Sequence, residues 1–371
     1  NNGNNLLNPG KAPHDNIQFL VFLIATIRAV YNYSDVLRAS VATYGNDHRL
    51  GANEAPPAII SIFLGDQLFN ILANIENGIV TKATNTEIID LGVSSLPILS
   101  KDNSDRNRTS PFAFTGNKFE FRAVSSSQSI SFPATVLNTI VAESMDYLAE
   151  KIKAKTGNIN QVVFEVLREE LKEIKPILFN GDNYTAEWEL EAEKRGLPNF
   201  KTTPVALQAL VTEKALNIFE KHEVLSRVEL KSRYLIYLER YIKDLEIEVK
   251  ALNNICMSQI IPSAVLYQKL LARTINETKA ALEGSAACFA EAEILKKVVD
   301  LIDKIYTANK DILAQVEKAE AVHDEQEKAD MLCRKVKTAM NELRDYVDEL
   351  ENLVDDDMWP MPKFWEMLFI S

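Results

Sequence analysis

Residues 46–57, NDHRLGANEAPP, concentrate ionisable side chains in a segment that cannot continue as one helix. These side chains belong to Asp47, His48, Arg49 and Glu54. Gly51 and the closing proline pair predict a loop, because glycine punctuates helices and proline breaks them. Loops held between rigid elements are where binding and catalytic residues concentrate. The segment is therefore predicted to be a functional loop, in which Arg49 supplies a guanidinium fork suited to an anion.

A second group of chemically capable side chains lies on a predicted strand at residues 119–124, FEFRAV. Aromatic and charged residues alternate there, which is typical of a half-buried strand. Glu120 and Arg122 have the same parity, so both side chains point to one face. The carboxylate can ligate Mg²⁺ through oxygen, and the guanidinium can bind a carboxylate or a phosphate with two hydrogen bonds. This pairing predicts a site that binds a cation and an anion together.

The basic residues of the two groups stand out because the chain is acidic, with a formal net charge of −12. They are Arg49, Arg108, Lys118 and Arg122. Together with Glu54 and Glu120 they predict anionic substrates, such as a nucleoside triphosphate and an amino acid. A plainer interpretation stays open, because Glu-x-Arg pairs on strands and charged loops are usually solvated, salt-bridged surfaces. The sequence has no P-loop, no GxGxxG after a strand and no GxSxG that would decide between the two.

Length and composition narrow the class of protein. A chain of 371 residues can hold two or more domains. Its acidic balance argues against a nucleic-acid binder, which needs a basic face to meet phosphates. Three widely spaced cysteines without a CxxC pair favour free thiols in a reducing compartment, so we expect a cytoplasmic protein. The most apolar run, residues 17–30, is too short to span a bilayer, so no membrane association is expected.

The elements that position the charged groups differ in kind before and after residue 130. The first part mixes helices with strands, whereas charged residues at helical spacing dominate the second part. In the first part we expect helices through residues 19–30, 36–41 and 66–75, strands at 58–64, 112–114 and 119–124, and a long loop at 81–107. In the second part we expect helices at residues 134–155, 162–174, 186–195, 225–254, 264–309 with a break near 284, and 311–353. The last three predict an antiparallel bundle or hairpin, and the aromatic tail at 358–370 must dock on another surface.

Several motifs together resemble the glutamine synthetase family, specifically its large type III enzymes. The segments HRLGANEAPPAIIS and NRTSPFAFTGNKFEFR carry the order RL…EAP, NR and E-x-R, similar to the second half of the synthetase catalytic domain. KPILFNGDNYTAEW, EKRGLPNF, RYLIYLERYIKDLEIE and WPMPKFWEML resemble the type III C-terminal region. The resemblance implies an α+β fold. Residues 1–150 would be the C-terminal part of the catalytic domain, an antiparallel sheet with helices, and residues 151–371 a helical region with a docking tail.

The family condenses glutamate with ammonia, using ATP, through γ-glutamyl phosphate, and type III enzymes form ring-type homo-oligomers, dodecamers by resemblance. Carried over, Arg49 would bind the glutamate α-carboxylate or the acyl phosphate, and Arg122 would hold the same substrate. Glu54 would be the flap carboxylate that helps to deprotonate ammonium and shields the intermediate from water. These roles agree with the anion-binding interpretation drawn from the residues alone.

The remaining carried-over roles concern the nucleotide and its metal. Arg108 would contact the ATP phosphates and stabilise charge in phosphoryl transfer, with Lys118 close to the nucleotide. Glu120 would ligate the divalent ion, Mg²⁺ or Mn²⁺, that bridges the phosphates. Arg49, Glu54 and Arg108 are thus the expected catalytic residues.

The sequence also departs from the family pattern. Type I enzymes have a second arginine five residues after the NR arginine, where this chain has Ala113, and the loop before Glu54 is one residue shorter. The family's other metal-binding glutamates and its metal-binding histidine lie upstream of Asn1. One carboxylate cannot hold two or three Mg²⁺ ions. We therefore expect the chain to be the C-terminal portion of the enzyme and to be inactive alone.

Two other functions stay open. The part after residue 130 could serve mainly as a helical oligomerisation module, with vestigial site residues before it. A related ATP-dependent ligase could instead join glutamate to another amine, because the amine pocket should lie mostly upstream of this chain.

Overall fold

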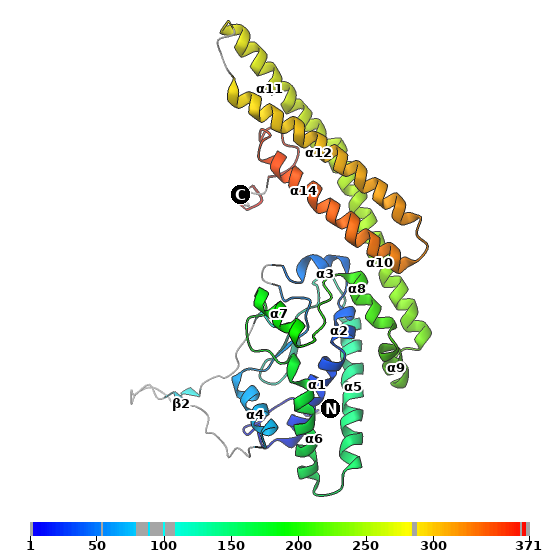
Figure 1. The fold of residues 1–371 in the computed structure, drawn as a ribbon. Coiled ribbons are helices and arrows are strands. Elements are labelled where there is room, and N and C mark those ends of the chain that lie inside the picture. The colour runs from blue at the N-terminus through cyan, green and yellow to red at the C-terminus, as the bar shows by residue number, and fades with distance from the viewer. Residues whose placement is uncertain are drawn as a thin grey trace. The chain divides into compact units, whose positions relative to one another are not determined.

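The computed structural model describes residues 3–52, 55–78, 88–89, 99–100, 108–283, 288–363 and 366–368 (Figure 1). The chain divides into two compact units, Asn1–Tyr237 and Leu238–Ser371. The expected boundary after residue 150 falls inside a helix of the first unit, because the helices that follow it pack with the first part of the chain. Where the family's catalytic domain ends stays a prediction.

Three helices form the core of the first unit: α1 (Ile17–Asn32), α5 (Ser131–Ala154) and α6 (Ile159–Ile174). They pack against one another (Figure 1), and α1 is buried on most of its circumference, as its apolar residues predict. Glu170 of α6 is fully buried, and its carboxylate accepts hydrogen bonds from Arg28 Nε at 2.9 Å and Lys151 Nζ at 2.7 Å. Since Arg28 lies on α1 and Lys151 on α5, this buried carboxylate links all three helices.

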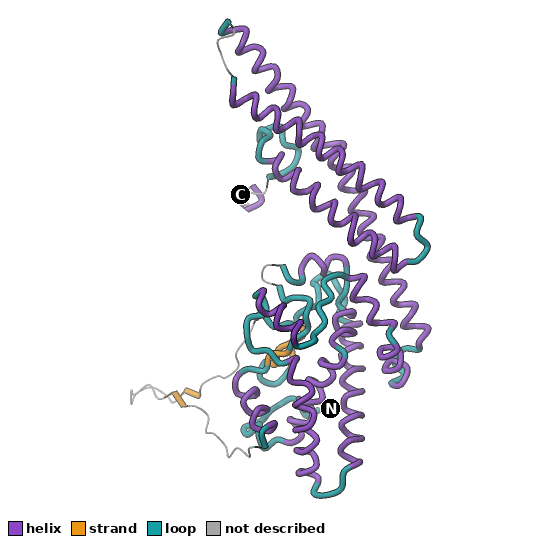
Figure 2. The backbone as a smooth tube through the Cα atoms, in the orientation of Figure 1, coloured by secondary structure: helices purple, strands orange, loops and turns teal. Residues whose placement is uncertain are grey.

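A three-stranded sheet joins these helices in the first unit (Figure 2): β1 (Ile62–Phe63), β4 (Phe112–Phe114) and β5 (Phe119–Phe121). The order is β1-β4-β5, with β4 antiparallel to β5 and parallel to β1. All three strands fall within the expected ranges, but the sheet is mixed and not antiparallel throughout. The lengths of the connections explain this. A tight turn joins β4 to β5, so these two strands run antiparallel, whereas the long connection between β1 and β4 allows those two strands to run parallel.

The remaining elements of the first unit are short. Its other α-helices are α2 (Ser34–Ser40), α3 (Tyr44–Arg49), α4 (Asp66–Glu76), α7 (Ala186–Lys194), α8 (Thr203–Leu207) and α9 (Glu213–Lys221). Two 3₁₀ turns occupy Lys175–Ile177 and Gln208–Val211. Within the expected loop at 81–107, β2 (Ile88–Ile89) and β3 (Leu99–Ser100) form an antiparallel pair. The rest of that segment lies outside the described residues.

The second unit is helical. Its elements are the end of α10 (Arg227–Ile255), a π-helical turn (Cys256–Ile260), α11 (Ile261–Ala281), α12 (Phe289–Glu320), α13 (Glu325–Met331), a second π turn (Leu332–Val336) and α14 (Lys337–Glu351). α12 packs against α11 and α14, which confirms the expected hairpin.

Two expected helix ends are wrong. The chain stays helical between residues 254 and 264, because the π turn directly before Pro262 widens the helix locally and accommodates the proline inside it. α12 also continues through residue 310 and ends at Glu320. The expected break near residue 284 falls between α11 and α12.

By length and composition, one continuous helix, Arg227–Ala281, could cross a membrane. The pair α1 and α2 also passes that test if it is counted as one span bent by 77°. The core helix of a globular protein passes the same test, and α1 is buried in the first unit. The expectation that the protein does not associate with membranes therefore stays a prediction.

The tail docks where the structure describes it. Trp359 is buried, and the carbonyl of Met358 accepts a hydrogen bond from Ser263 Oγ on α11. Lys363 is buried as well, and its Nζ donates to the carbonyl of Val354 at 2.9 Å. These contacts within the second unit confirm the prediction of a docked tail for residues 358–363.

Candidate active site

The segment expected to be a loop begins as a helix. Residues 46–49 complete α3, and the side chain of Thr43 caps this helix by accepting a hydrogen bond from the backbone N–H of Asn46 at 3.2 Å. The proline pair lies too far downstream to prevent one helical turn, since proline restricts mainly the residue before it. The loop therefore starts at Leu50, and Gly51, at φ 78°, donates its N–H to the carbonyl of Pro56 at 3.0 Å.

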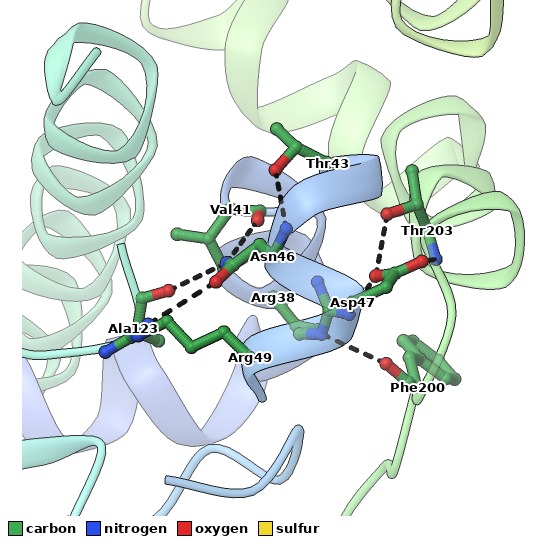
Figure 3. Close-up of polar contacts among 9 residues, drawn as sticks. All are labelled: Arg38, Val41, Thr43, Asn46, Asp47, Arg49, Ala123, Phe200 and Thr203. Carbon is green, nitrogen blue, oxygen red and sulfur yellow. Dashed lines mark hydrogen bonds and ion pairs between the residues drawn. The ribbon is translucent and has the colours of Figure 1, made fainter. Parts of the chain in front are cut away.

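Helix α3 brings Arg49 to the end of strand β5 (Figure 3). Arg49 Nη2 donates to the carbonyl of Arg122 at 2.8 Å, and its Nη1 donates to Asn46 Oδ1 at 3.4 Å. Asn46 is fully buried, and its Nδ2 donates to the carbonyls of Val41 at 2.8 Å and Ala123 at 2.9 Å. The structure thus joins the side chain of Arg49 to the backbone of Arg122, the other arginine for which the sequence predicts substrate binding.

Glu120 and Arg122 interact across one face of β5, as their parity predicts. Arg122 Nη2 donates to Glu120 Oε2 at 3.0 Å, and Thr115 Oγ1 donates to Glu120 Oε1 at 3.2 Å. Lys118 Nζ lies 3.6 Å from the same Oε1. The hydrogen bond from Arg122 holds the pKa of the Glu120 carboxyl below its ordinary value. The side chain of Glu120 is 39% exposed, and an incoming divalent ion would replace Arg122 and Lys118 as the cations beside its carboxylate.

The aromatic residues on either side of Glu120 face the opposite way. Phe119 stacks on Phe112 of β4 with ring centroids 4.9 Å apart, and Phe121 lies 5.9 Å from the same ring. Both are half-buried. In the sheet register Ala113 pairs with Glu120, so the position at which type I enzymes have an arginine stands directly beside the carboxylate.

Arg108 is exposed and lies just before β4. Residues of the FNGDNY segment contact its backbone and the side chain of the residue that follows it. Tyr184 Oη donates to the carbonyl of Arg108 at 3.4 Å, and the N–H of Asn183 donates to Thr109 Oγ1 at 3.0 Å. Asn183 is buried, and its Oδ1 accepts a hydrogen bond from Ser61 Oγ at 2.6 Å. The turn-like FNGDNYT pattern gave no sign of this role, because the partners lie far away in sequence.

The last site residue predicted from the sequence, Glu54, lies outside the described residues together with Asn53. The structure therefore connects Arg49, Arg122, Glu120 and Lys118 through direct contacts and places Arg108 at the start of the adjoining strand. A buried ion pair that the sequence did not reveal lies on the other side of α3. Arg38 Nη2 is 3.3 Å from Asp47 Oδ1, and both side chains are 1% exposed.

The described residues contain one group of side chains spaced to hold a metal ion, namely Glu143, Asp146 and His222. Glu120 is not a member of it. Lys221 Nζ lies 2.7 Å from Glu143 and 3.8 Å from Asp146, so a cation already neutralises these carboxylates. For a divalent ion near β5, the described residues offer Glu120 as a carboxylate ligand, and further oxygen ligands would have to come from elsewhere.

Comparison with known proteins identifies the relatives of this chain. Residues 162–279 match the model of the glutamine synthetase C-terminal domain. The type-3 glutamine synthetase of Dictyostelium discoideum is 42% identical over 99% of this chain and 51% of its own length. Glutamine synthetases of Butyrivibrio fibrisolvens and Bacteroides fragilis are 40% and 35% identical over 99% of this chain, each matched over 52% of its length. The chain spans about half the length of these relatives.

These matches confirm the resemblance seen in the motifs, since nearly the whole chain is similar to about half of a glutamine synthetase. Among these relatives, the Dictyostelium discoideum protein is the one named as a type-3 enzyme.

Proposed function

We propose that this chain supplies the glutamate-binding half of a glutamate–ammonia ligase site. In this reaction ATP phosphorylates the γ-carboxylate of glutamate, and ammonia displaces the phosphate to give glutamine. The observation that carries the proposal is the contact chain at the end of β5, in which Arg49 Nη2 donates to the backbone carbonyl of Arg122 and the Arg122 guanidinium donates to the partly exposed Glu120 carboxylate. Such a set suits an amino acid with two carboxylates, bound next to a cation.

Each residue then has a defined task. Arg49 and Arg122 bind the carboxylates of glutamate, and Arg108 and Lys118 bind the phosphates of ATP. Glu120 is the ligand for Mg²⁺ or Mn²⁺, which neutralises phosphate charge when it is bound. The carboxylate is ionised at neutral pH, and the hydrogen bond from Arg122 lowers its pKa and so extends the ionised form to more acidic solutions.

Glu54 is assigned to the proton chemistry. It takes a proton from ammonium and keeps water from the acyl phosphate. The first part of the chain is, in this proposal, the end of the family's α+β catalytic domain, and the remaining metal ligands come from the other half of the full-length protein. Three free cysteines, two of them buried, suit a cytoplasmic setting.

The test is to replace Arg122 in the full-length protein with alanine or lysine. We expect the alanine variant to lower kcat/KM for glutamate at least about tenfold, because one hydrogen bond to a charged group contributes roughly 1.5–3 kcal/mol. The lysine variant keeps the charge but loses the planar fork and should fall in between. Assembly is followed by light scattering, so that a lost site is separated from a lost oligomer. An alanine variant with unchanged kinetics would show that the site is vestigial.

An assembly function for the second unit has its own support. Large apolar side chains stay exposed on the part of the α10–α11 helix that lies in this unit, among them Ile247, Met257, Val265, Leu266 and Leu270. Exposed apolar patches mark interaction surfaces. We propose that they contribute to a homo-oligomer, of the ring type suggested by the resemblance, in addition to the ligase activity. The alternative function, a ligase that joins glutamate to another amine, would differ from this proposal only in the pocket for the amine, which lies beyond the residues of this site.

A further inference from the structure

Asn46 occupies a position that the proposed roles do not use. It is fully buried, and its Nδ2 faces two backbone carbonyls, those of Val41 and Ala123. Only the amino side of the amide can donate to both, so the orientation of the side chain is fixed. Its Oδ1 therefore points to Arg49, from which it accepts a hydrogen bond at 3.4 Å.

These contacts tie α3 to the two residues that follow β5, and Figure 3 shows the contact of Asn46 with the second of them, Ala123. Asn46 is bonded to the carbonyl of Ala123, and Arg49 to the carbonyl of Arg122, so two consecutive peptide groups are held by one helical turn. A guanidinium has five N–H groups, and these contacts of Arg49 use two of them. Because the guanidinium is planar and rigid, the same two contacts also fix the directions of its remaining N–H groups.

The opposite face of α3 is anchored independently. Asp47 Oδ2 accepts the N–H of Thr203 at 2.7 Å, and Oδ1 accepts its hydroxyl at 2.8 Å. Arg38 pairs with Asp47 and donates through Nε to the carbonyl of Phe200 at 3.0 Å. Phe200 and Thr203 belong to the segment that matches the synthetase C-terminal domain. The helix is thus fixed on one side to β5 and on the other to that domain.

We propose that Asn46 is a positioning residue that sets the spacing between the guanidinium groups of Arg49 and Arg122 for the two carboxylates of glutamate. The inference rests on the proposed function, since it concerns the same site. A protein without the Asn46 side chain would still contain both arginines. The guanidinium of Arg49 could then turn, however, and α3 could shift against the residues that follow β5. A displacement of about 1 Å in such a site costs up to about a hundredfold in rate.

The experiment measures KM for glutamate, KM for ATP and kcat in the full-length protein with Asn46→Ala. We expect KM for glutamate to rise about ten- to a hundredfold, with KM for ATP unchanged. Thr43→Val is the matched control, because it removes the cap of the same helix, a hydrogen bond from the backbone N–H of Asn46, but leaves the contacts of the Asn46 side chain in place. It should lower the unfolding temperature and leave KM for glutamate unchanged.

Two results would overturn the inference. One is an unchanged KM for glutamate in Asn46→Ala, and the other is an equal rise in Thr43→Val, which would mean that helix stability alone matters. If the alanine variant does not fold, Asn46→Ser keeps a hydroxyl donor for Ala123 and should raise KM for glutamate several-fold. Arg122→Ala serves as the reference. If that variant also leaves glutamate binding intact, the proposed function itself fails, whereas a defect confined to Arg122→Ala refutes the role of Asn46 alone.

Discussion

At the scale of single residues, the candidate site contains a carboxylate that a guanidinium donor stabilises in its ionised form. Arg122 lowers the pKa of Glu120 from its ordinary value of 4.5. The folded protein therefore prefers the ionised carboxyl, and this contribution to stability is present above pH 4.5. It is lost as the pH falls through the lower pKa of the folded state.

Removing the donor should reverse this shift. In Arg122→Ala we expect the pKa of Glu120 to rise toward 4.5, because the first cause of its depression is the hydrogen bond from Arg122. NMR titration of ¹³C-labelled glutamate side chains measures this, with Glu120→Gln to assign the signal. Thr115→Val, which removes a weaker donor, should raise the pKa by less. A pKa in Arg122→Ala equal to that of the wild type would contradict the account of the pair.

The sequence revealed these residues only in part. The alternation of FEFRAV and the parity of Glu120 and Arg122 predicted their shared face, which their hydrogen bond confirms. Asn46 was overlooked because an amide among charged groups carries no local signal, and its partner Ala123 lies 77 positions away. Asn183 was overlooked for the same reason, since its bond to Ser61 joins residues 122 positions apart.

At the scale of elements, short segments hold the site and are sensitive to added volume. A Cβ at Gly181 would lie 2.6 Å from the ring of Phe179. That ring cannot move freely, because it stacks on Trp188 with centroids 3.8 Å apart. The strain would be transmitted to Asn183, whose backbone N–H donates a hydrogen bond to Thr109, the residue after Arg108.

We therefore expect Gly181→Ala to destabilise the protein by about 1–3 kcal/mol, as overpacking usually does. Denaturant unfolding of the chain measures the change. Gly45→Ala is the matched control, since an added Cβ there meets nothing within 4 Å and α3 gains a better helix former. Equal stability of the two variants would refute the assigned packing.

Helical elements were predictable where their periodicity was sustained, but their ends were not. Capping by Thr43 extended a helix into a segment read as a loop. A π turn carried α10 into α11 across a proline that usually ends a helix. In both cases a contact or a local adjustment outweighed the residue type on which the expectation was based.

At the scale of the whole molecule, the second unit is expected to serve assembly. Leu266 and Leu270 are exposed one turn apart on α11. Replacing both with glutamate should dissociate the full-length oligomer into smaller species, because charges would be buried at an apolar contact. Light scattering coupled to size exclusion measures the mass. Lys269→Glu, between them on the same helix, is the control. An unchanged mass in the double variant would remove this surface from the assembly.

The central claim is that Arg49 and Arg122 form the glutamate-binding pair of a glutamate–ammonia ligase. Glutamine formation from glutamate, ammonia and ATP by the full-length protein tests it most directly, with wild type compared with Arg49→Ala/Arg122→Ala. We predict that the wild type forms glutamine and that the double variant loses at least about a hundredfold in kcat/KM for glutamate while keeping its oligomeric mass, since each arginine contributes at least one charge-assisted interaction. Equal rates in the two proteins, or a wild type that forms no glutamine, would contradict the account.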